Sequence, residues 1–465
     1  MARCFVHFSP RAAAVSLAMS AVFILSACSM QPSRSFPEVQ LPESFSNPKI
    51  TATVSVDTNW WHGFDSPELS ALMAQLAAQN LDLATASLRV ERAQFQLGQT
   101  RADNLPAVSG RLSGRGGENL DTGLTSLSSS ASIGAIYDVD IWGSREASIL
   151  ASTLNIDVSQ AQLRNQSVLL QRQLANAYFT QLSLQQRLAI AKQNVTASEQ
   201  LLSLIQLRYD AGSASGIELA QQRNTLLSAQ NEVLRLSNQL AINNRALAAL
   251  LADSEFQQRE FTAPVNSLAL PEIDVQQPAS VLRQRPDVAA AFLQLQLADI
   301  SVYQASIAGL PGLSLSADLG MSDLTDLANG WSLSAALSSA MVLFDNGKRE
   351  QAERVANVDT QIAFNNLMTT IISAAQEMQD AADNYRFQRE AYALDLIELE
   401  NNQRLYDLAQ ARYKSGDSDF LNLLNAQRSW FSAQLNVINR YQSALSAAVD
   451  VYTAARGLPV TNTDS

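Results

Sequence analysis

The stretch that decides the fold is LQRQLANAYFTQLSLQQRLAIAKQNVTASEQLLSLIQLRY, residues 170–209 of this 465-residue chain. It contains no proline or glycine, and mostly apolar residues recur in it at steps of four and three. Except for Gln181 and Ser198, these positions are apolar, which is the heptad pattern of packed helices. They are Leu170, Leu174, Ala177, Gln181, Leu184, Leu188, Ala191, Val195, Ser198, Leu202, Ile205 and Tyr209. A single helix from Gly143 to Asp210 would extend about 100 Å at 1.5 Å per residue, longer than a compact domain needs.

Several motifs of this region return 204 residues later, which indicates a tandem duplication. Gly143-Ser144-Arg145-Glu146 returns as Gly347-Lys348-Arg349-Glu350, and Arg208-Tyr209-x-x-Gly212 returns as Arg412-Tyr413-x-x-Gly416. Leu105-Pro106 returns at 205 residues as Leu310-Pro311. We therefore predict a first repeat over residues 59–255, a linker over 256–280, a second repeat over 281–459 and a short flexible tail over 460–465.

Each repeat is expected to hold further helices around its longest one. The spacing predicts helices over residues 71–101 and 280–306, each leading into strands. After the longest helix, a turn containing Gly212 and Gly216, or Gly416 in the second copy, sends the chain back along a shorter helix. These return helices are expected to end near Leu251 and Ala455.

In two segments of each repeat, apolar and polar side chains alternate, as in β-strands. Residues 127–141, 313–322 and 331–343 carry apolar side chains on one parity and mostly serine on the other, and residues 108–115 show a poorer version of the pattern. The apolar parity includes Leu127, Ala131, Ile133, Ala135, Tyr137, Val139, Ile141, Trp331, Leu333, Ala335, Leu337, Met341 and Leu343. Such strands suit a barrel that faces lipid outside and water inside. A half-buried strand of a soluble sheet has the same pattern, so alternation leaves both readings open.

The N-terminus has the layout of an exported lipoprotein. Residues 1–27 carry Arg3 and Arg11, no acid, and then an apolar run, as a signal peptide does. The run ends in Leu25-Ser26-Ala27-Cys28, which resembles a bacterial lipobox and predicts a lipid anchor on Cys28. Ser29 favours the outer membrane, and residues 28–58 are expected to form an extended tether. The alternative is an ordinary secreted protein with a chance cysteine. Because no later stretch has 18 uninterrupted apolar residues, any crossing of a bilayer would use strands.

Composition excludes several classes of function. With 32 Lys+Arg against 44 Asp+Glu, the formal charge is −12, which argues against nucleic acid as a partner. Removal of Arg3 and Arg11 with the signal peptide would lower it to −14. Two cysteines and two histidines leave no disulfide framework, and we expect no cofactor, no metal site and no enzyme activity. Gly114-Arg115-Gly116-Gly117 superficially resembles a phosphate loop, but no strand-to-helix unit follows it and Gly116-Gly117 lies in an expected loop.

The order of these motifs resembles the outer-membrane factors of the TolC family, in the lipoprotein branch typified by OprM and NodT-like efflux subunits. The resemblance covers essentially all of the mature chain and rests on the lipobox, the paired Arg-Tyr-x-x-Gly turns and three further motifs. These are Trp60-Trp61-x-x-Phe64-x-x-Pro67-x-Leu69, Asn80-Leu81-Asp82-Leu83 and Arg285-Pro286-Asp287.

The resemblance implies a mixed α and β membrane protein. Three chains, each giving four strands, would form one twelve-stranded β-barrel continued by a long α-helical barrel across the periplasm. Residues 115–125 and 322–330 would be extracellular loops. Residues 209–218 and 413–422 would be periplasmic tips where a membrane fusion protein docks, with Tyr209, Gly212, Gly216, Tyr413 and Gly416 as the docking residues. Four strands cannot close a membrane barrel by themselves, so association is expected from the strand count as well.

The tip is also where the family closes its channel with acidic side chains. Glu218 occupies the matching place in the first copy, whereas Asn422 and Asn425 stand where some members carry aspartate. Asp417 and Asp419 are close enough in sequence to supply charge, so the candidate gate charges are Glu218, Asp417 and Asp419.

The function expected from this resemblance is that of a passive outer-membrane exit duct in a tripartite efflux system. Its partners would be two further copies of the chain, outer-membrane lipid, a periplasmic fusion protein and an inner-membrane pump of the RND type. The pump, rather than a lumen lined by serine and glycine, would select the cargo, with the acidic net charge mildly favouring cations. The alternatives are the exit duct of an ATP-driven secretion system and a lipid-anchored periplasmic coiled-coil scaffold that forms no pore.

Overall fold

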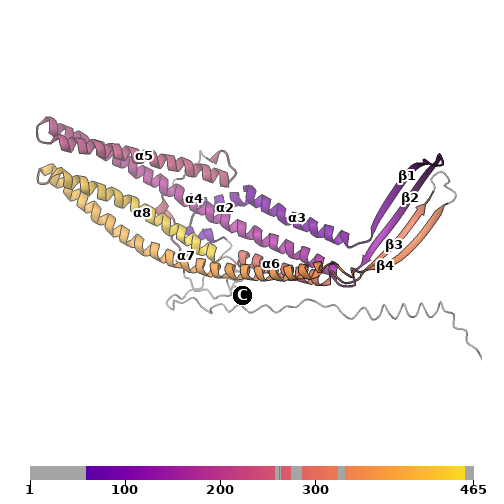
Figure 1. Ribbon diagram of the computed structural model, residues 1–465. Helices are drawn as coiled ribbons and strands as arrows, with labels where there is room; N and C mark the ends of the chain where they lie inside the picture. Colours follow the sequence, from indigo (N-terminus) through magenta and orange to yellow (C-terminus); the bar gives the residue numbers. More distant parts are fainter. Residues whose placement is uncertain (1–58, 257–260, 262, 274–284, 323–329, 456–465) are drawn as a thin grey trace, which may run out of the picture. The chain divides into compact units, whose positions relative to one another are not determined.

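The computed structural model describes residues 59–256, 261, 263–273, 285–322 and 330–455. Helix, two strands, a long helix and a shorter helix follow one another twice along the chain (Figure 1). The first series is η2 (Trp60–Phe64), α2 (Pro67–Gln79), α3 (Leu81–Asp103), β1 (Ala107–Asn119), β2 (Leu124–Val139), α4 (Ser144–Asp210) and α5 (Gly216–Leu250). After η4 (Val265–Ser267), the second is α6 (Pro286–Ile307), β3 (Gly312–Met321), β4 (Trp331–Ala340), α7 (Lys348–Ser415) and α8 (Phe420–Ala454).

The chain divides into two compact units, each made of segments from both halves of the sequence. Among the described residues, the first unit comprises 89–159 and 290–367 and contains the whole sheet. The second unit comprises the described residues of 59–88, 160–289 and 368–455 and contains the helix turns.

The two long helices agree closely with the prediction. The 67 residues of α4 begin one residue after Gly143 and end at Asp210. Asp140 fixes its start, since its carboxylate accepts hydrogen bonds from the backbone N–H groups of Ser144 (2.8 Å) and Arg145 (2.9 Å). Asp345 does the same for α7. Across the described ranges, no helix is both long enough and apolar enough to serve as a membrane span.

The predicted single helix over residues 71–101 was wrong, because the chain breaks at Asn80. This residue has an extended backbone (φ −67°, ψ 126°), and its side-chain oxygen accepts from the N–H groups of Asp82 and Leu83, which makes it the N-cap of α3. Its side-chain nitrogen donates to the carbonyl of Leu250 at 2.8 Å. The apolar spacing continues through the break and therefore does not reveal it. In the second half, α6 begins at Pro286, and residues 280–284 lie outside the described residues.

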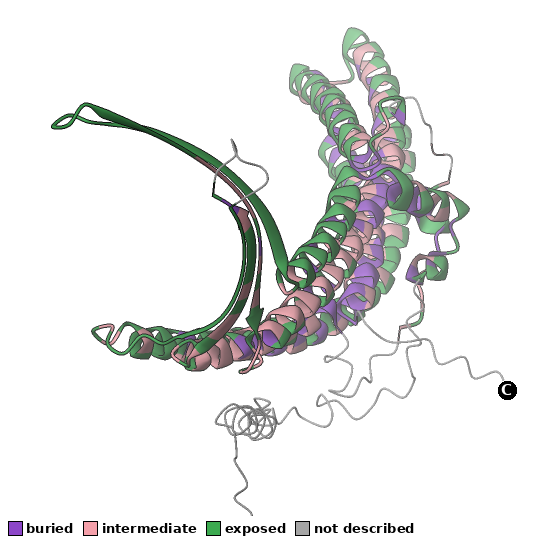
Figure 2. Ribbon diagram, turned by 90° about the vertical axis from the view of Figure 1, so that its right-hand side faces the viewer, coloured by how far each residue is buried: buried purple, intermediate pink, exposed green. Residues whose placement is uncertain are grey.

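The four strands form one antiparallel sheet in the order β1-β2-β3-β4 (Figure 1). The central pairing of β2 with β3 brings together strands from the two halves of the chain. β1 and β4 are the edges and pair with no further strand in the part of the chain that the structure describes. The edge strands β1 and β4 are exposed along their whole length, whereas β2 and β3 also contain half-buried residues (Figure 2). The exposed residues include large apolar side chains such as Leu127 and Leu333.

The register divides the sheet into a polar face and an apolar face, because directly paired residues point to the same side. The polar face includes Ser109, Arg111, Ser113, Arg115, Ser128, Ser130, Ser132, Asp138, Ser314, Ser316, Asp318, Ser332, Ser334 and Ser338. The apolar face includes Val108, Leu112, Leu127, Ala131, Ile133, Ala135, Tyr137, Val139, Leu313, Leu315, Ala317, Leu319, Met321, Trp331, Leu333, Ala335 and Leu337. The exceptions are Leu124 and Ile136 on the polar face, and Glu118, Thr125, Ser129 and Ser339 on the apolar face.

The observed strand ends differ from the prediction in several places. The predicted loop over residues 115–125 shrinks to 120–123, because Gly116 and Gly117 pair with Leu127 and Ser126 within the sheet. Ladder hydrogen bonds outweigh the weak strand preference of glycine there. In the second half, the strands end and resume at Met321 and Trp331 as predicted, but residues 323–329 lie outside the described ones. Ile141, Met341 and Leu343 lie beyond the strand ends.

Candidate functional site

Both predicted helix turns lie in the second unit and are built alike. Gly212 (φ 72°) and Gly416 (φ 83°) occupy the left-handed region, where a side chain is strained. Their N–H groups donate to the carbonyls of Tyr209 (2.9 Å) and Tyr413 (3.2 Å). The next residues donate to the arginine carbonyls one position earlier, at 2.7 Å and 2.9 Å. The repeated Arg-Tyr-x-x-Gly motif is thus a helix C-cap in both copies.

The return helices begin with side-chain caps. Ser215 accepts a hydrogen bond from the N–H of Glu218 at 3.2 Å, and Asp419 accepts one from the N–H of Asn422 at 3.0 Å. Gly216, predicted as part of the turn, is the first residue of α5 and has a negative φ. Asp417 and Asp419 are exposed and Glu218 is half-buried, so the three candidate gate charges gather at the two turns, with Asp419 also engaged as a cap.

The two turns meet in a cluster of buried side chains that we call the turn cluster. Its members are Ile205, Leu219, Tyr413, Phe420, Leu423 and Leu424. Arg208 reaches across from the first turn, with its guanidinium carbon 4.7 Å from the centre of the Tyr413 ring and a hydrogen bond of 3.3 Å to the Tyr413 carbonyl. The sequence shows Arg208 and Arg412 as equivalents and does not indicate that only the former bridges the two turns.

The two tyrosines of the motif differ sharply in environment. Tyr209 is 44% exposed, whereas Tyr413 is 3% exposed. Burial raises the pKa of the Tyr413 hydroxyl, and the positive charge of Arg208 opposes this rise while the negative charge of Glu218 adds to it. The hydroxyl is buried without a hydrogen-bond partner among the described residues. The expectation that Tyr413 offers its side chain to a docking partner is therefore corrected, because that side chain packs inside the turn cluster.

Exposed apolar side chains surround the turns instead. Leu207 is 66% exposed, Ile217 is 71% exposed and Leu421 is 50% exposed. Like Tyr209, they are exposed near the turns, where binding of another protein would bury apolar area. The sequence did not single out these three residues, since an isolated apolar residue near a turn carries no distinct signal.

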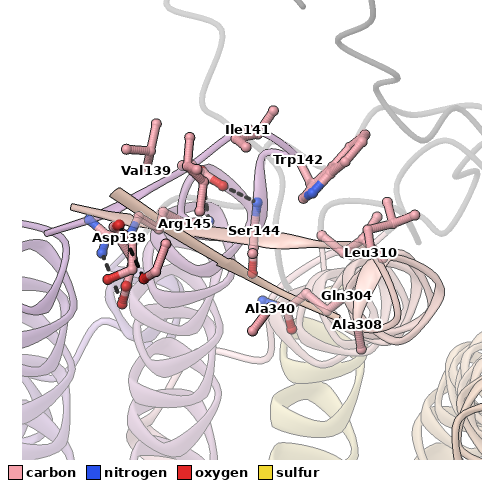
Figure 3. Close-up of a pocket in the computed structure, with 16 residues that line it drawn as sticks. Asp138, Val139, Ile141, Trp142, Ser144, Arg145, Gln304, Ala308, Leu310 and Ala340 are labelled. Carbon is pink, nitrogen blue, oxygen red and sulfur yellow. Dashed lines mark hydrogen bonds and ion pairs between the residues drawn. The ribbon is translucent and has the colours of Figure 1, made fainter. Parts of the chain in front are cut away.

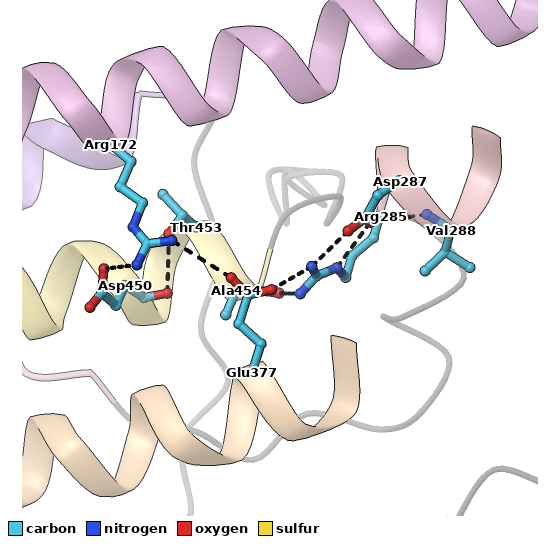
Figure 4. Close-up of polar contacts among 8 residues, drawn as sticks. All are labelled: Arg172, Arg285, Asp287, Val288, Glu377, Asp450, Thr453 and Ala454. Carbon is cyan, nitrogen blue, oxygen red and sulfur yellow. Dashed lines mark hydrogen bonds and ion pairs between the residues drawn. The ribbon is translucent and has the colours of Figure 1, made fainter. Parts of the chain in front are cut away.

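Arg285 has a larger structural part than the sequence indicated. It is 2% exposed and binds both oxygens of Asp287 (3.1 and 2.8 Å), Glu377 Oε2 (2.7 Å) and the carbonyl of Ala454 (2.8 Å) (Figure 4). Burial alone would lower the pKa of Arg285, but the two carboxylates together outweigh it and raise that pKa. The Arg-Pro-Asp motif thus ties the start of α6 to α7 and to the end of α8.

A second pair of charges lies beside Arg285. Arg172 lies 2.8 Å from Asp450 and 3.7 Å from the other oxygen of Glu377 (Figure 4). Burial raises the pKa of Asp450, and the positive charge of Arg172 offsets this rise only in part. The negative charge of Glu377 raises the pKa further. These contacts fix four helices of the second unit to one another.

The arginine of the repeated Gly-x-Arg-Glu motif has a structural role in the first unit. Arg145 donates to the carbonyl of Asn104 at 2.5 Å, and Arg349 donates to the carbonyl of Gly309 at 3.2 Å. Each arginine therefore ties the start of a long helix to the chain just after the preceding helix. A hollow of about 530 Å³ beside the first junction is lined by Arg145, Trp142, Gln304 and Leu310, among others (Figure 3). The indole nitrogen of Trp142 donates to the carbonyl of Pro311 at 2.8 Å.

The described residues contain no cluster of three or more His, Cys, Asp or Glu side chains placed to hold a metal ion. His62 is exposed and packs edge-on to Trp61, while Trp60 stacks on Tyr452. Cys28, the predicted lipid anchor, lies outside the described residues.

Comparison with known proteins decides the family. A family model described as outer membrane efflux protein matches residues 72–253 and 278–455. The chain belongs to this family. The resemblance to TolC-type outer-membrane factors predicted from the sequence is confirmed. As a member of the outer membrane efflux protein family, it is the outer-membrane exit duct of an efflux system.

Relatives match the chain along most of its length. The pyoverdine export outer membrane protein OpmQ of Pseudomonas putida is 30% identical over 414 residues, covering 86% of this chain and 88% of that protein. The probable outer membrane lipoprotein SilC of Salmonella typhimurium is 26% identical, covering 95% and 98%. A crystal structure of CusC has a TM-score of 0.84 at 24% identity, covering 92% of this chain and 100% of that chain, which supports the mixed, mostly helical fold.

Proposed function

We propose that three copies of this chain form one channel, in which each sheet supplies a third of a twelve-stranded barrel. The long helices continue it as an α-helical tunnel through the periplasm. The observation that carries the proposal is the separation of polar and apolar faces across all four strands, combined with edge strands β1 and β4 that have no partner in the described chain. Joining β4 of one copy to β1 of the next satisfies both edges, while the apolar faces meet lipid and the polar faces meet water.

The same separation of faces favours a duct over a periplasmic scaffold. A scaffold needs long helices and an anchor, but it has no use for a sheet with one face of exposed leucine, isoleucine and tryptophan. The recurring order of helices and strands supports a tandem duplication, with repeats over 59–255 and 281–459. In a closed ring, such repeats would give six similar units around the axis.

The duct works passively and catalyses no reaction. An inner-membrane pump of the RND type supplies the energy, and a periplasmic fusion protein connects the pump to the helix turns. The apolar side chains around Tyr209 form the docking surface, with Gly212 and Gly416 shaping the turns that present it and Gly216 starting the return helix α5. Glu218, Asp417 and Asp419 supply negative charge at the closing point. An ATP-driven exporter remains the alternative source of energy.

Cys28 carries the lipid anchor in this proposal, which agrees with the name of the relative SilC, a probable outer membrane lipoprotein. Replacement of Cys28 by Ala should abolish incorporation of labelled palmitate. Incorporation that persists in this variant would refute the assignment.

A pair of neighbouring substitutions tests the channel. Leu333 is 79% exposed on the apolar face, and Ser334 follows it on the polar face. Leu333→Arg should prevent assembly in the outer membrane, because an arginine facing lipid near the bilayer centre costs about 2–4 kcal/mol per chain. Ser334→Arg, facing water, should still give heat-sensitive trimers in membrane fractions and conductance in planar bilayers. Equal tolerance of both variants, or pore-free wild-type monomers, would refute the proposal.

A further inference from the structure

Four charged side chains are found on the polar face of the sheet, and the register separates them by sign. Arg111 and Arg115 lie on β1 toward its turn with β2. Asp318 pairs with Gly134, and Asp138 pairs with Ser314 nearer the helices. At about 3.3 Å per residue, Arg115 lies about 13 Å beyond Arg111, and Asp318 about 7 Å on the opposite side. The turn half of this face is therefore positive and the helix half is negative.

Arg111 and Arg115 differ from arginines such as Arg145 and Arg285, which pair with carboxylates. Arg111 pairs across the strands with Ser132 and Arg115 with Ser128, and both arginines are exposed. In the described residues, neither guanidinium has a carboxylate within ion-pair distance. In contrast, Asp138 lies 3.9 Å from Arg145. A guanidinium that has no carboxylate partner and lies among serine hydroxyls has its donors available to an oxyanion.

Closure of the trimer would concentrate these charges. Twelve strands spaced about 4.8 Å apart and tilted by about 40° give a barrel radius of about 12 Å. A side chain that reaches more than 4 Å inward then places its charge within a Debye length, about 8 Å, of the axis. Because the strands are tilted, three copies would place six positive charges in a zone about 10 Å tall along the axis, inside walls that focus the field.

We propose that Arg111 and Arg115 form an anion-binding zone in the outer half of the channel, which takes carboxylate, phosphate or sulfate groups of exported substrates. This inference rests on the proposed function, because it needs the polar face to line a lumen. It runs against the net charge of −12, which taken alone favours cations. The sign at the exit is set by which residues reach the lumen, whereas the net charge counts all of the chain.

Ion selectivity tests the zone in planar bilayers of phosphatidylcholine, which contain no anionic lipid. We expect R111Q/R115Q to raise the permeability ratio of K⁺ over Cl⁻ about threefold, and R111K/R115K to stay near wild type. Glu118→Gln is the matched control, since it removes a charge from the same strand on the opposite face and should leave the ratio unchanged. Citrate should block the wild type at concentrations about tenfold lower than it blocks R111Q/R115Q.

A local reporter removes any contribution of the helix turns. Ser113 lies between the two arginines on the same face, so S113C can be labelled with anionic and cationic thiol reagents of similar size. Loss of both arginines should lower the ratio of anionic to cationic labelling rates about tenfold. An unchanged labelling ratio and an unchanged permeability ratio in conducting trimers would overturn the anion-binding zone. Block by anions that appears only when anionic lipid is added would overturn it as well. Absence of conducting wild-type trimers would instead refute the channel itself.

Discussion

Replacing Arg285 with Met should loosen the start of α6 and the end of α8 together. The arginine is 2% exposed and makes four hydrogen bonds, two to Asp287, one to Glu377 and one to the Ala454 carbonyl. Methionine has a comparable unbranched stem and can fill much of the same space, so the loss is mainly that of charge and donors. The substitution leaves two carboxylates and one carbonyl without their shared donor.

The expected cost is about 3 kcal/mol. Breaking a buried ion pair by removing one partner costs about 3–5 kcal/mol. Asp287 and Glu377 have side chains that are 26% and 36% exposed, so water can partly replace the arginine, and the lower end of this range applies. Ala454 is fully buried, and its carbonyl contributes about 1–3 kcal/mol of this if it stays unpaired.

Amide hydrogen exchange measures this cost locally, without requiring reversible unfolding of the whole protein. A loss of 3 kcal/mol corresponds to exchange about 150-fold faster in the first turn of α6 and the last turn of α8. Arg285→Lys should fall between the wild type and R285M, because lysine keeps the charge and loses the planar fork. Arg354→Met is the control, since Arg354 is 66% exposed and pairs with Glu350 on the same helix, and it should change exchange less than threefold. An increase of less than fivefold in R285M would refute the reasoning.

Three further predictions concern backbone strain and pH. Gly416→Ala should destabilise the protein by about 1 kcal/mol in urea unfolding, because Gly416 has a positive φ. Gly98→Ala should stabilise it by about 0.5–1 kcal/mol, because Gly98 lies within α3 with open space around it. Because burial raises the pKa of Asp450, the wild type should gain stability as pH falls through that pKa toward the ordinary value of 3.8. Asp450→Asn should therefore have the higher urea midpoint at neutral pH, with the difference vanishing below pH 3.8. Burial raises the pKa of Tyr385 to about 12, so stability tied to its neutral form should be lost between pH 10 and 12. The phenolate absorbance of Tyr385, which is the part of the signal absent from Tyr385→Phe, should develop around pH 12.

Each of these has a clear contrary result. Equal effects of alanine at positions 98 and 416 would show that the left-handed backbone is not what the turn requires. A midpoint difference between Asp450→Asn and the wild type that grows on acidification would reverse the assigned sign. Tyrosine absorbance near pH 10 that disappears in Tyr385→Phe would show that this hydroxyl is hydrated.

Much of the fold could be predicted from the sequence because its signals are local. A proline-free heptad run set the course of α4, and Gly212 and Gly416 marked its end and that of α7 through a backbone conformation that other residues avoid. Strand alternation gave three of the four strands and both faces. The prediction ended β1 too early, before Gly116, because the pairing of this segment with β2 is not visible in the local sequence. The helix break at Asn80 was missed because the carbonyl that Asn80 binds belongs to Leu250, far along the chain.

The candidate site, too, could be predicted only in part from the sequence. The sequence located both turns and their capping glycines, and it gave Arg208 and Arg412, or Tyr209 and Tyr413, as equal copies. The tertiary structure makes them unequal, since Arg208 crosses to the second turn and Tyr413 is buried beneath it. The reason is that a duplicated chain packs its two copies against each other and not against identical neighbours. Helix lengths, caps and strand faces follow from neighbouring residues, whereas burial and charge pairing depend on which residues folding brings close.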